Sequence, residues 1–74
     1  MNRLDATDLY VLLERAFHRR SRECGGCAFS LPFRLDGTPE TNWAVIPSHT
    51  CSPKCEDILH EVVAEMQGSY RLAE

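Results

Sequence analysis

The residues of this sequence best suited to chemistry are its four cysteines. They form two close pairs, with two residues between Cys24 and Cys27 and three between Cys51 and Cys55. A close pair lets one short segment supply two thiolate ligands, and four thiolates complete the tetrahedral shell of a structural zinc ion. The spacing therefore predicts one structural Zn²⁺ bound by Cys24, Cys27, Cys51 and Cys55.

His49 is the rival ligand, since it lies two residues before Cys51. A site of three cysteines and His49 would relieve the wide spacing of the second pair. The plainer interpretation is a loop histidine exposed to water. His18 and His60 are expected on polar helix faces, where side chains are solvated.

Catalytic chemistry has little support in this sequence. Cys24 and Cys27 flank two glycines, as in a thiol oxidoreductase motif, but such a motif follows a strand and opens a helix. Here the preceding segment is predicted to be helical and the following one extended. The sequence also lacks a zinc-deaminase signature and a phosphate loop. Four thiolates would leave no open position for water on the metal, so we expect no enzymatic activity and no small-molecule substrate.

An amphipathic helix over residues 5–20 is predicted before the first cysteine pair. Asp5 is a suitable N-cap, and Asp8 complements the positive end of the helix dipole. The apolar residues that recur with helical periodicity are Leu9, Leu12, Leu13, Ala16 and Phe17. The glycines between Cys24 and Cys27 then mark a tight turn.

A two-stranded hairpin is predicted between the cysteine pairs. Residues 28–35 alternate, which places four apolar side chains on one face: Phe29, Leu31, Phe33 and Leu35. Pro32 lies on the other face and favours an edge strand, because it cannot donate a ladder hydrogen bond. Residues 36–40 are predicted to form a polar turn, and residues 42–46 are predicted to form the returning strand.

A second helix is predicted to begin after Ser52. Ser52 serves as its N-cap, and Pro53 occupies the first helical position, where its missing N–H costs nothing. Gly68 is the expected terminator. Residues 69–74 are expected to be a frayed tail, although Tyr70 and Leu72 could fold back onto the helix.

The order of these elements resembles the treble-clef zinc finger. Over residues 24–67, a cysteine knuckle is followed by a hairpin and by a helix whose start carries the last two cysteines. Treble clefs usually have two residues between the helix-borne ligands, whereas this chain has three. The resemblance implies a small zinc-stapled α+β domain with an extra N-terminal helix, in the order helix, zinc knuckle, hairpin, helix.

The length of the chain limits it to one domain over residues 1–74. A core this small needs disulfides, a metal or a partner, since in chains below about 80 residues the burial of apolar side chains alone rarely stabilises the fold sufficiently. Asp5 and Asp8 and the short apolar run over residues 9–13 do not fit a secretory signal, and no segment could span a membrane. We therefore expect a cytoplasmic protein, where reduced thiols favour metal binding over disulfides.

Charge is unevenly distributed along this chain, whose net charge is −3. Residues 1–34 hold six arginines and four acids, and residues 35–74 hold two cations and seven acids. The overall acidity argues against a general duplex-binding protein. A basic cluster of Arg15, Arg19, Arg20 and Arg22 is nevertheless a candidate phosphate-binding patch. The alternative is that these cations complement the end of the helix dipole.

The last candidate is Trp43, on the returning strand of the hairpin. Trp43 shares one face with Val45, while Ala44 and Ile46 share the other. Trp43 is expected in the core, with a partner-binding anchor as the alternative. The leading hypothesis is a non-catalytic structural-zinc protein that acts as a protein-interaction module or adaptor. The alternative is a nucleic-acid-binding zinc finger that uses the arginine cluster.

Overall fold

The computed structural model describes residues 2–36 and 41–73. In chain order the elements are β1 (Asn2–Leu4), α1 (Ala6–Arg20), the 3₁₀ turn η1 (Arg22–Cys24), β2 (Phe33–Arg34), β3 (Trp43–Ala44), α2 (Pro53–Gln67) and β4 (Tyr70–Leu72). This is a small α+β domain with two helices and short strands, as predicted. Within the described residues, no helix is both long enough and apolar enough to cross a membrane.

Helix α1 forms where the capping signals placed it. The Asp5 carboxylate accepts a hydrogen bond from the Asp8 backbone N–H at 2.8 Å, which satisfies a donor that has no partner within the helix. The helix ends at Ser21, whose N–H donates to the Phe17 carbonyl. One face of α1 is fully buried, through Leu9, Leu13 and Phe17.

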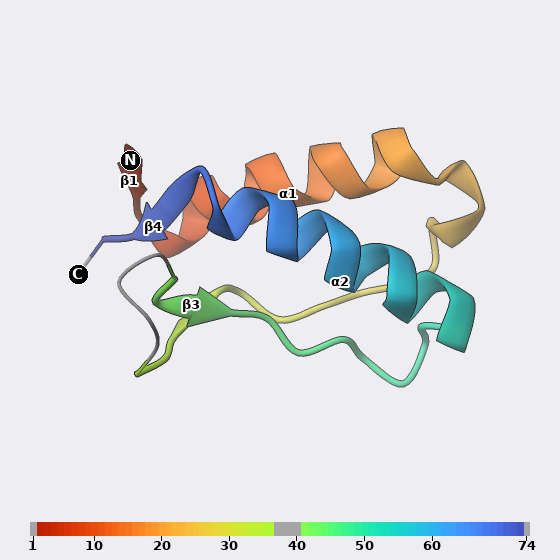
Figure 1. Cartoon of the computed structure of the whole chain (residues 1–74). Coiled ribbons are helices and arrows are strands. Elements are labelled where there is room, and N and C mark those ends of the chain that lie inside the picture. Colours follow the sequence, from red (N-terminus) through yellow and green to blue (C-terminus); the bar gives the residue numbers. More distant parts are fainter. Residues whose placement is uncertain (1, 37–40, 74) are drawn as a thin grey trace.

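Helix α2 also matches its prediction. The Ser52 hydroxyl accepts from the Cys55 N–H at 3.2 Å, Pro53 stands in the first turn, and Gly68 caps the other end. Its buried face consists of Cys55, Leu59, Val62, Val63 and Met66. The two helices lie side by side and run in opposite directions, so their apolar faces meet (Figure 1).

The hairpin packs along the helix pair and contributes Trp43 to the core (Figure 1). Trp43 is fully buried, and its Nε1–H donates to the Tyr70 carbonyl at 3.1 Å. The strands are only two residues each, although backbone bonds continue the pairing as far as Ser48 and Ala28. The predicted hairpin is therefore present, and most of its predicted turn, residues 37–40, lies outside the described residues.

A shift in register decides which hairpin side chains face the core. Near the cysteines Phe29 pairs with Pro47, whereas further along Phe33 pairs with Ala44. The first arm therefore has one residue more than the second between these pairs, as in a β-bulge. A shift of one residue exchanges the two faces of a strand. Phe29 is buried before the shift and Pro32 is buried after it.

The predicted tail contains a strand. Residues 70–72 form β4, which pairs in parallel with β1 in the register Asn2 with Tyr70, Arg3 with Arg71 and Leu4 with Leu72. The prediction of a frayed tail over 69–74 was therefore wrong for these residues. Three-residue strands carry no periodic signal, and the partners lie at opposite ends of the sequence, so only the folded chain brings them together.

Candidate functional site

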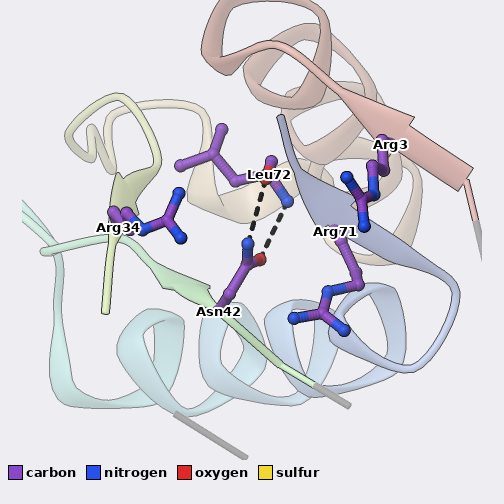
Figure 2. A pocket seen from close by; sticks show the side chains of 5 residues that line it. All are labelled: Arg3, Arg34, Asn42, Arg71 and Leu72. Carbon is purple, nitrogen blue, oxygen red and sulfur yellow. Dashed lines mark hydrogen bonds between the residues drawn. The ribbon is translucent and has the colours of Figure 1, made fainter. Parts of the chain in front are cut away.

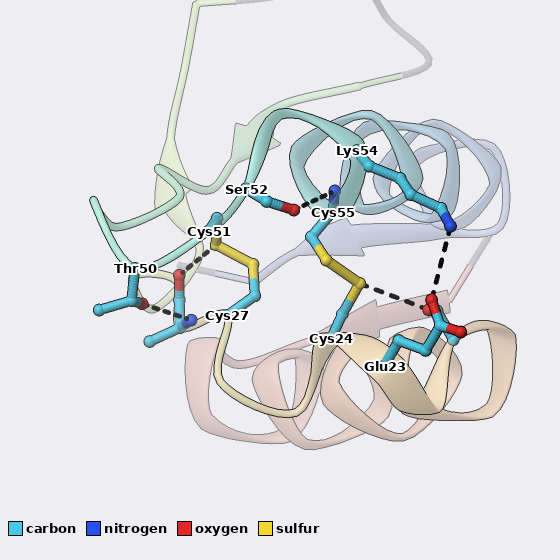
Figure 3. The surroundings of a disulfide bond; sticks show 10 residues. Glu23, Cys24, Cys27, Thr50, Cys51, Ser52, Lys54 and Cys55 are labelled. Carbon is cyan, nitrogen blue, oxygen red and sulfur yellow. Dashed lines mark hydrogen bonds and ion pairs between the residues drawn. A yellow bond between two sulfur atoms is a disulfide. The ribbon is translucent and has the colours of Figure 1, made fainter.

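The four cysteines converge as predicted, but they bond to one another (Figure 3). Cys24 forms a disulfide with Cys55, and Cys27 forms one with Cys51, with Cα–Cα distances of 5.8 and 4.2 Å. Among the described residues, no group of three or more His, Cys, Asp or Glu side chains could hold a metal ion. The predicted structural zinc and its four-cysteine ligand set were wrong, and the treble-clef zinc-finger interpretation is withdrawn with them.

Local structure explains why these four sulfur atoms meet. Cys24 closes η1, and the Cys27 N–H donates to the Cys24 carbonyl at 3.0 Å, so the glycine turn holds the first pair together. The Ser52 cap fixes Cys55 in the first turn of α2. Cys24 and Cys55 are buried, whereas Cys51 is half-buried with its Sγ 3.2 Å from the Ala28 carbonyl oxygen. The same convergence suits a metal or two disulfides, and spacing alone does not distinguish them.

The disulfides also correct the expected compartment. Two disulfide bonds in a domain of this size are typical of oxidising, extracellular or secreted environments, because cytosolic thiols are kept reduced. The cytoplasmic prediction was therefore wrong. It relied on the composition of the first residues, whereas the pairing depends on which thiols the fold places together.

The three histidines are not buried beside the disulfides. His18, His49 and His60 are all exposed. The alternative ligand set of three cysteines and His49 was wrong for the same reason as the four-cysteine set, because all four cysteines are disulfide-bonded.

All four arginines of the cluster are exposed, and one of them, Arg20, pairs with acidic residues of α2. Nη2 of Arg20 donates to both Glu65 oxygens at 2.7 and 2.6 Å, and Nη1 lies 3.5 Å from Glu61. This hydrogen bonding lowers the pKa of Glu65 and raises the pKa of Arg20. Arg20 thus connects α1 to α2. The other members, Arg15, Arg19 and Arg22, are exposed, and their role in nucleic-acid binding stays a prediction.

The hairpin presents an apolar surface that sequence reasoning identified only on its second strand. Because of the register shift, the outward side chains of both arms are large and apolar. We call this surface the hairpin face, and its exposed fractions are 54% for Leu31, 36% for Phe33, 40% for Leu35 and 61% for Ile46. Trp43 lies on the opposite, core side and has no exposed surface to offer a partner. The alternation over residues 29–35 was the available signal, but periodicity alone does not say which face is buried.

The fold and its cross-links define the class of protein as a small, disulfide-stapled α+β domain. No family model, no curated protein and no solved structure matches this chain.

Proposed function

We propose that this protein is a non-catalytic module that binds another protein through the hairpin face. The single observation that carries the proposal is the exposure of four large apolar side chains, Leu31, Phe33, Leu35 and Ile46, on one side of the hairpin. Monomeric proteins rarely leave contiguous apolar patches uncovered, and such patches mark contact surfaces. The partner that suits this chemistry is a protein with an apolar surface patch.

Hydrogen bonds and a disulfide connect the two arms of the hairpin beneath the hairpin face. The Ser30 hydroxyl accepts from the Ile46 N–H at 2.9 Å, and the Ser30 N–H donates to the Ile46 carbonyl at 2.9 Å. Below this point the Cys27–Cys51 disulfide ties the two arms together. A surface that is already ordered loses less conformational entropy when it binds.

The chemistry of the cysteines fits a structural role in such a module. The Cys24–Cys55 bond joins η1 to the first turn of α2, and the Cys27–Cys51 bond joins the two arms at the base of the hairpin, so together they hold the shape of the contact surface. A small secreted domain commonly uses disulfides in this way, since its core is limited.

Site-specific photocrosslinking tests this proposal. A photoreactive amino acid replaces Ile46 in one sample and Val11 in a control, since Val11 is also an exposed apolar residue but lies on α1. Both samples are mixed with the extracellular fraction of the source cells and irradiated. We expect a defined protein adduct at position 46 that is absent at position 11, and the adduct identifies the partner.

Binding to the purified partner then measures the contribution of the face. Ile46→Ser should weaken binding by about tenfold or more, because a central apolar contact contributes more than about 1.4 kcal/mol. Val11→Ser should leave the affinity within about twofold. Equal adducts at positions 46 and 11, or unchanged affinity for Ile46→Ser, would contradict the proposal.

A further inference from the structure

We propose that a groove beside α1 binds a medium-chain fatty acid, with the alkyl chain on an apolar floor and the carboxylate between two arginines. The groove has a volume of about 300 Å³ and lies where α1 meets the end of α2 and β4, which are neighbours in Figure 1. We call it the helix groove, and its lining residues are Leu12, Arg15, Ala16, Arg19, Met66 and Tyr70. All of them belong to α1, α2 or β4, so the helix groove is separate from the hairpin face and the proposal goes beyond the proposed function.

One stripe of α1 supplies both the apolar and the basic part of the helix groove. Leu12, Arg15, Ala16 and Arg19 are spaced by three and four residues, so they lie on one side of the helix. Leu12 and Ala16 are half-buried and pack against the core, whereas Arg15 and Arg19 are exposed. An apolar surface and two positive charges therefore adjoin along the same side of α1.

The end of the chain supplies the other side of the helix groove. Met66 in the last turns of α2 is 8% exposed, and Tyr70 at the start of β4 is half-buried. The Tyr70 carbonyl accepts from Nε1–H of the buried Trp43 at 3.1 Å, which holds this part of β4 in place. Met is a flexible apolar side chain that adapts to the shape of its neighbour. The floor between α1 and β4 can therefore accept an alkyl chain.

Both arginines of the helix groove are available to an anion. Among the described residues, neither Arg15 nor Arg19 forms an ion pair or a hydrogen bond with an acidic side chain. They are one turn apart on α1, and like charges at this spacing destabilise a helix. Arg19 lies in the last turn, where it complements the helix dipole, but Arg15 does not. A carboxylate bound between the two arginines would offset their repulsion.

A second pocket with arginines lacks these properties. Figure 2 shows Arg3, Arg34 and Arg71 around Asn42, whose side chain is hydrogen-bonded to the Leu72 N–H and carbonyl. Arg34 and Arg71 already have interaction partners. Of the residues that line this pocket, only Leu72 is apolar, so an alkyl chain would find no floor there.

The ligand class follows from the size of the helix groove and the shape of its donors. A guanidinium presents its N–H groups as a planar fork that matches the two oxygens of a carboxylate. A volume of about 300 Å³ is at the lower end of the range for ligand pockets. It holds about ten groups the size of a water molecule, which takes up about 30 Å³ in the liquid, and a methylene group is of similar size. The helix groove therefore suits a single chain of about ten carbons.

Two other acidic ligands fit the helix groove less well. Single-stranded nucleic acid binds on aromatic side chains that stack with its bases, and Tyr70 is the one aromatic residue among those that line the groove. An amphipathic partner helix needs apolar anchors over about two turns. The apolar part of α1 in the groove, from Leu12 to Ala16, covers about one turn.

Nuclear magnetic resonance titration of the oxidised protein with sodium decanoate tests the proposal. Decanoate is added at neutral pH and constant ionic strength, below the concentration at which it forms micelles. We expect saturable shifts in the methyl signals of Ala16 and Met66 and in the side-chain N–H signals of Arg15 and Arg19. The methyl signals of Ile46 report on the hairpin face and should shift less. Shifts that do not saturate, or that are larger at Ile46, would overturn the proposal.

A ligand series on the unaltered protein separates the chain from the headgroup. A fully buried methylene improves affinity about fourfold, and a groove that is open on one side buries about half of it, so decanoate should bind about fourfold more tightly than octanoate. Decanol, which has no charge, and acetate, which has no chain, should each bind at least fivefold more weakly than decanoate. Equal affinity for octanoate and decanoate, or for decanol and decanoate, would contradict the proposal. A thymidine oligonucleotide that saturates the same signals at a lower concentration than decanoate would assign the groove to nucleic acid instead.

Two substitutions and a matched control locate the headgroup. Arg15→Gln and Arg19→Gln should each weaken decanoate binding at least fivefold, because each removes a charge-assisted fork. Arg22→Gln removes an exposed arginine on η1, outside the helix groove, and should leave the affinity unchanged. Equal weakening by all three substitutions would mean non-specific attraction and would refute the site. The ligand series needs no substitution, so it decides the matter if a variant fails to fold.

Discussion

The four cysteines differ in how deeply they are buried, although all four are cross-linked. Cys24, Cys27 and Cys55 are 2%, 6% and 9% exposed and belong to the core, while Cys51 is half-buried. The Cys24–Cys55 bond spans 31 residues of sequence and the Cys27–Cys51 bond spans 24. Because longer loops lose more entropy when they are closed, both bonds restrict the unfolded chain. Both cysteines of the first bond are buried in the core, but only one cysteine of the second bond is.

Paired substitution separates these two contributions. Replacing Cys24 and Cys55 together by Ala should lower the free energy of unfolding by about 3–5 kcal/mol. Replacing Cys27 and Cys51 together should cost less, because less buried surface is lost. Urea unfolding of the two double variants measures the difference. A larger loss for the Cys27–Cys51 pair would contradict this ranking.

The Arg20–Glu65 ion pair makes a small, pH-dependent contribution. Hydrogen bonding to Arg20 lowers the pKa of Glu65 from its ordinary value of 4.5, so the ionised carboxylate is the form that stabilises the fold. The contribution is therefore present above the pKa of the unfolded chain and is lost as the pH falls through the lowered pKa.

Thermal melts of wild type and Glu65→Gln measure this contribution. The melting temperature of the wild type should be slightly higher than that of Glu65→Gln at neutral pH, and this difference should vanish in strong acid. It should also shrink in high salt, since both groups are exposed and salt screens them. Glu61→Gln should have a smaller effect, because Glu61 lies 3.5 Å from Arg20. A difference that persists in strong acid would show that the charge of Glu65 is not its cause.

At the scale of elements, short strands depend on side chains that connect them. Neither two-stranded sheet is stable by itself, since isolated strand pairs are marginal in water. Asn42 connects the hairpin to β4 through two hydrogen bonds to Leu72, and Trp43 adds a third bond, to Tyr70. These contacts attach β4 and its partner β1 to the rest of the domain.

Asn42→Ala should loosen this attachment. Loss of two half-buried hydrogen bonds should cost about 1–3 kcal/mol in urea unfolding and should speed hydrogen exchange at the Leu72 amide. Thr41→Ala is the matched control, because the buried Thr41 hydroxyl has no hydrogen-bond partner among the described residues. A cost for Thr41→Ala equal to that of Asn42→Ala would mean that the hydrogen bonds are not responsible.

The whole molecule is elongated, 32 × 20 × 18 Å, and it is fastened at both ends. The disulfides hold the end where α1 finishes and α2 begins, and the β1–β4 pair holds the other end (Figure 1). Among the described residues there is one buried core cluster, in which the apolar faces of both helices pack against Trp43, Phe29 and the disulfide-bonded Cys24 and Cys27. With so few buried side chains, the cross-links carry a large share of the stability.

Reduction should therefore unfold most of the protein. Each disulfide contributes about 3–4 kcal/mol, and total stability of small domains starts near 5 kcal/mol, so losing both should consume most of it. Circular dichroism should show a melt that a reductant lowers steeply and that a chelator leaves unchanged. A thiol assay of the unreduced, denatured chain should detect no free thiol. Four free thiols, or a melt sensitive to the chelator, would contradict the disulfide assignment.

The two helices and the existence of the hairpin could be predicted from local sequence signals. Asp5 and Ser52 cap the helices, and the apolar residues between caps and terminators keep a period of 3.6, so both helices follow from neighbours in the chain. The convergence of the four cysteines followed from the same elements. These features could be predicted because the interactions that cause them act within a few residues.

Features that depend on residues far apart in the sequence could be seen only in the folded chain. The β1–β4 pair joins opposite ends of the chain. The bulge turns Leu31 and Phe33 outward, and Arg20 of α1 forms an ion pair with Glu65 of α2. The pairing of the thiols, which overturned the zinc prediction, belongs here too. Local spacing brings four sulfur atoms near one another, but it is their final geometry and redox state that determine whether they bind a metal or each other.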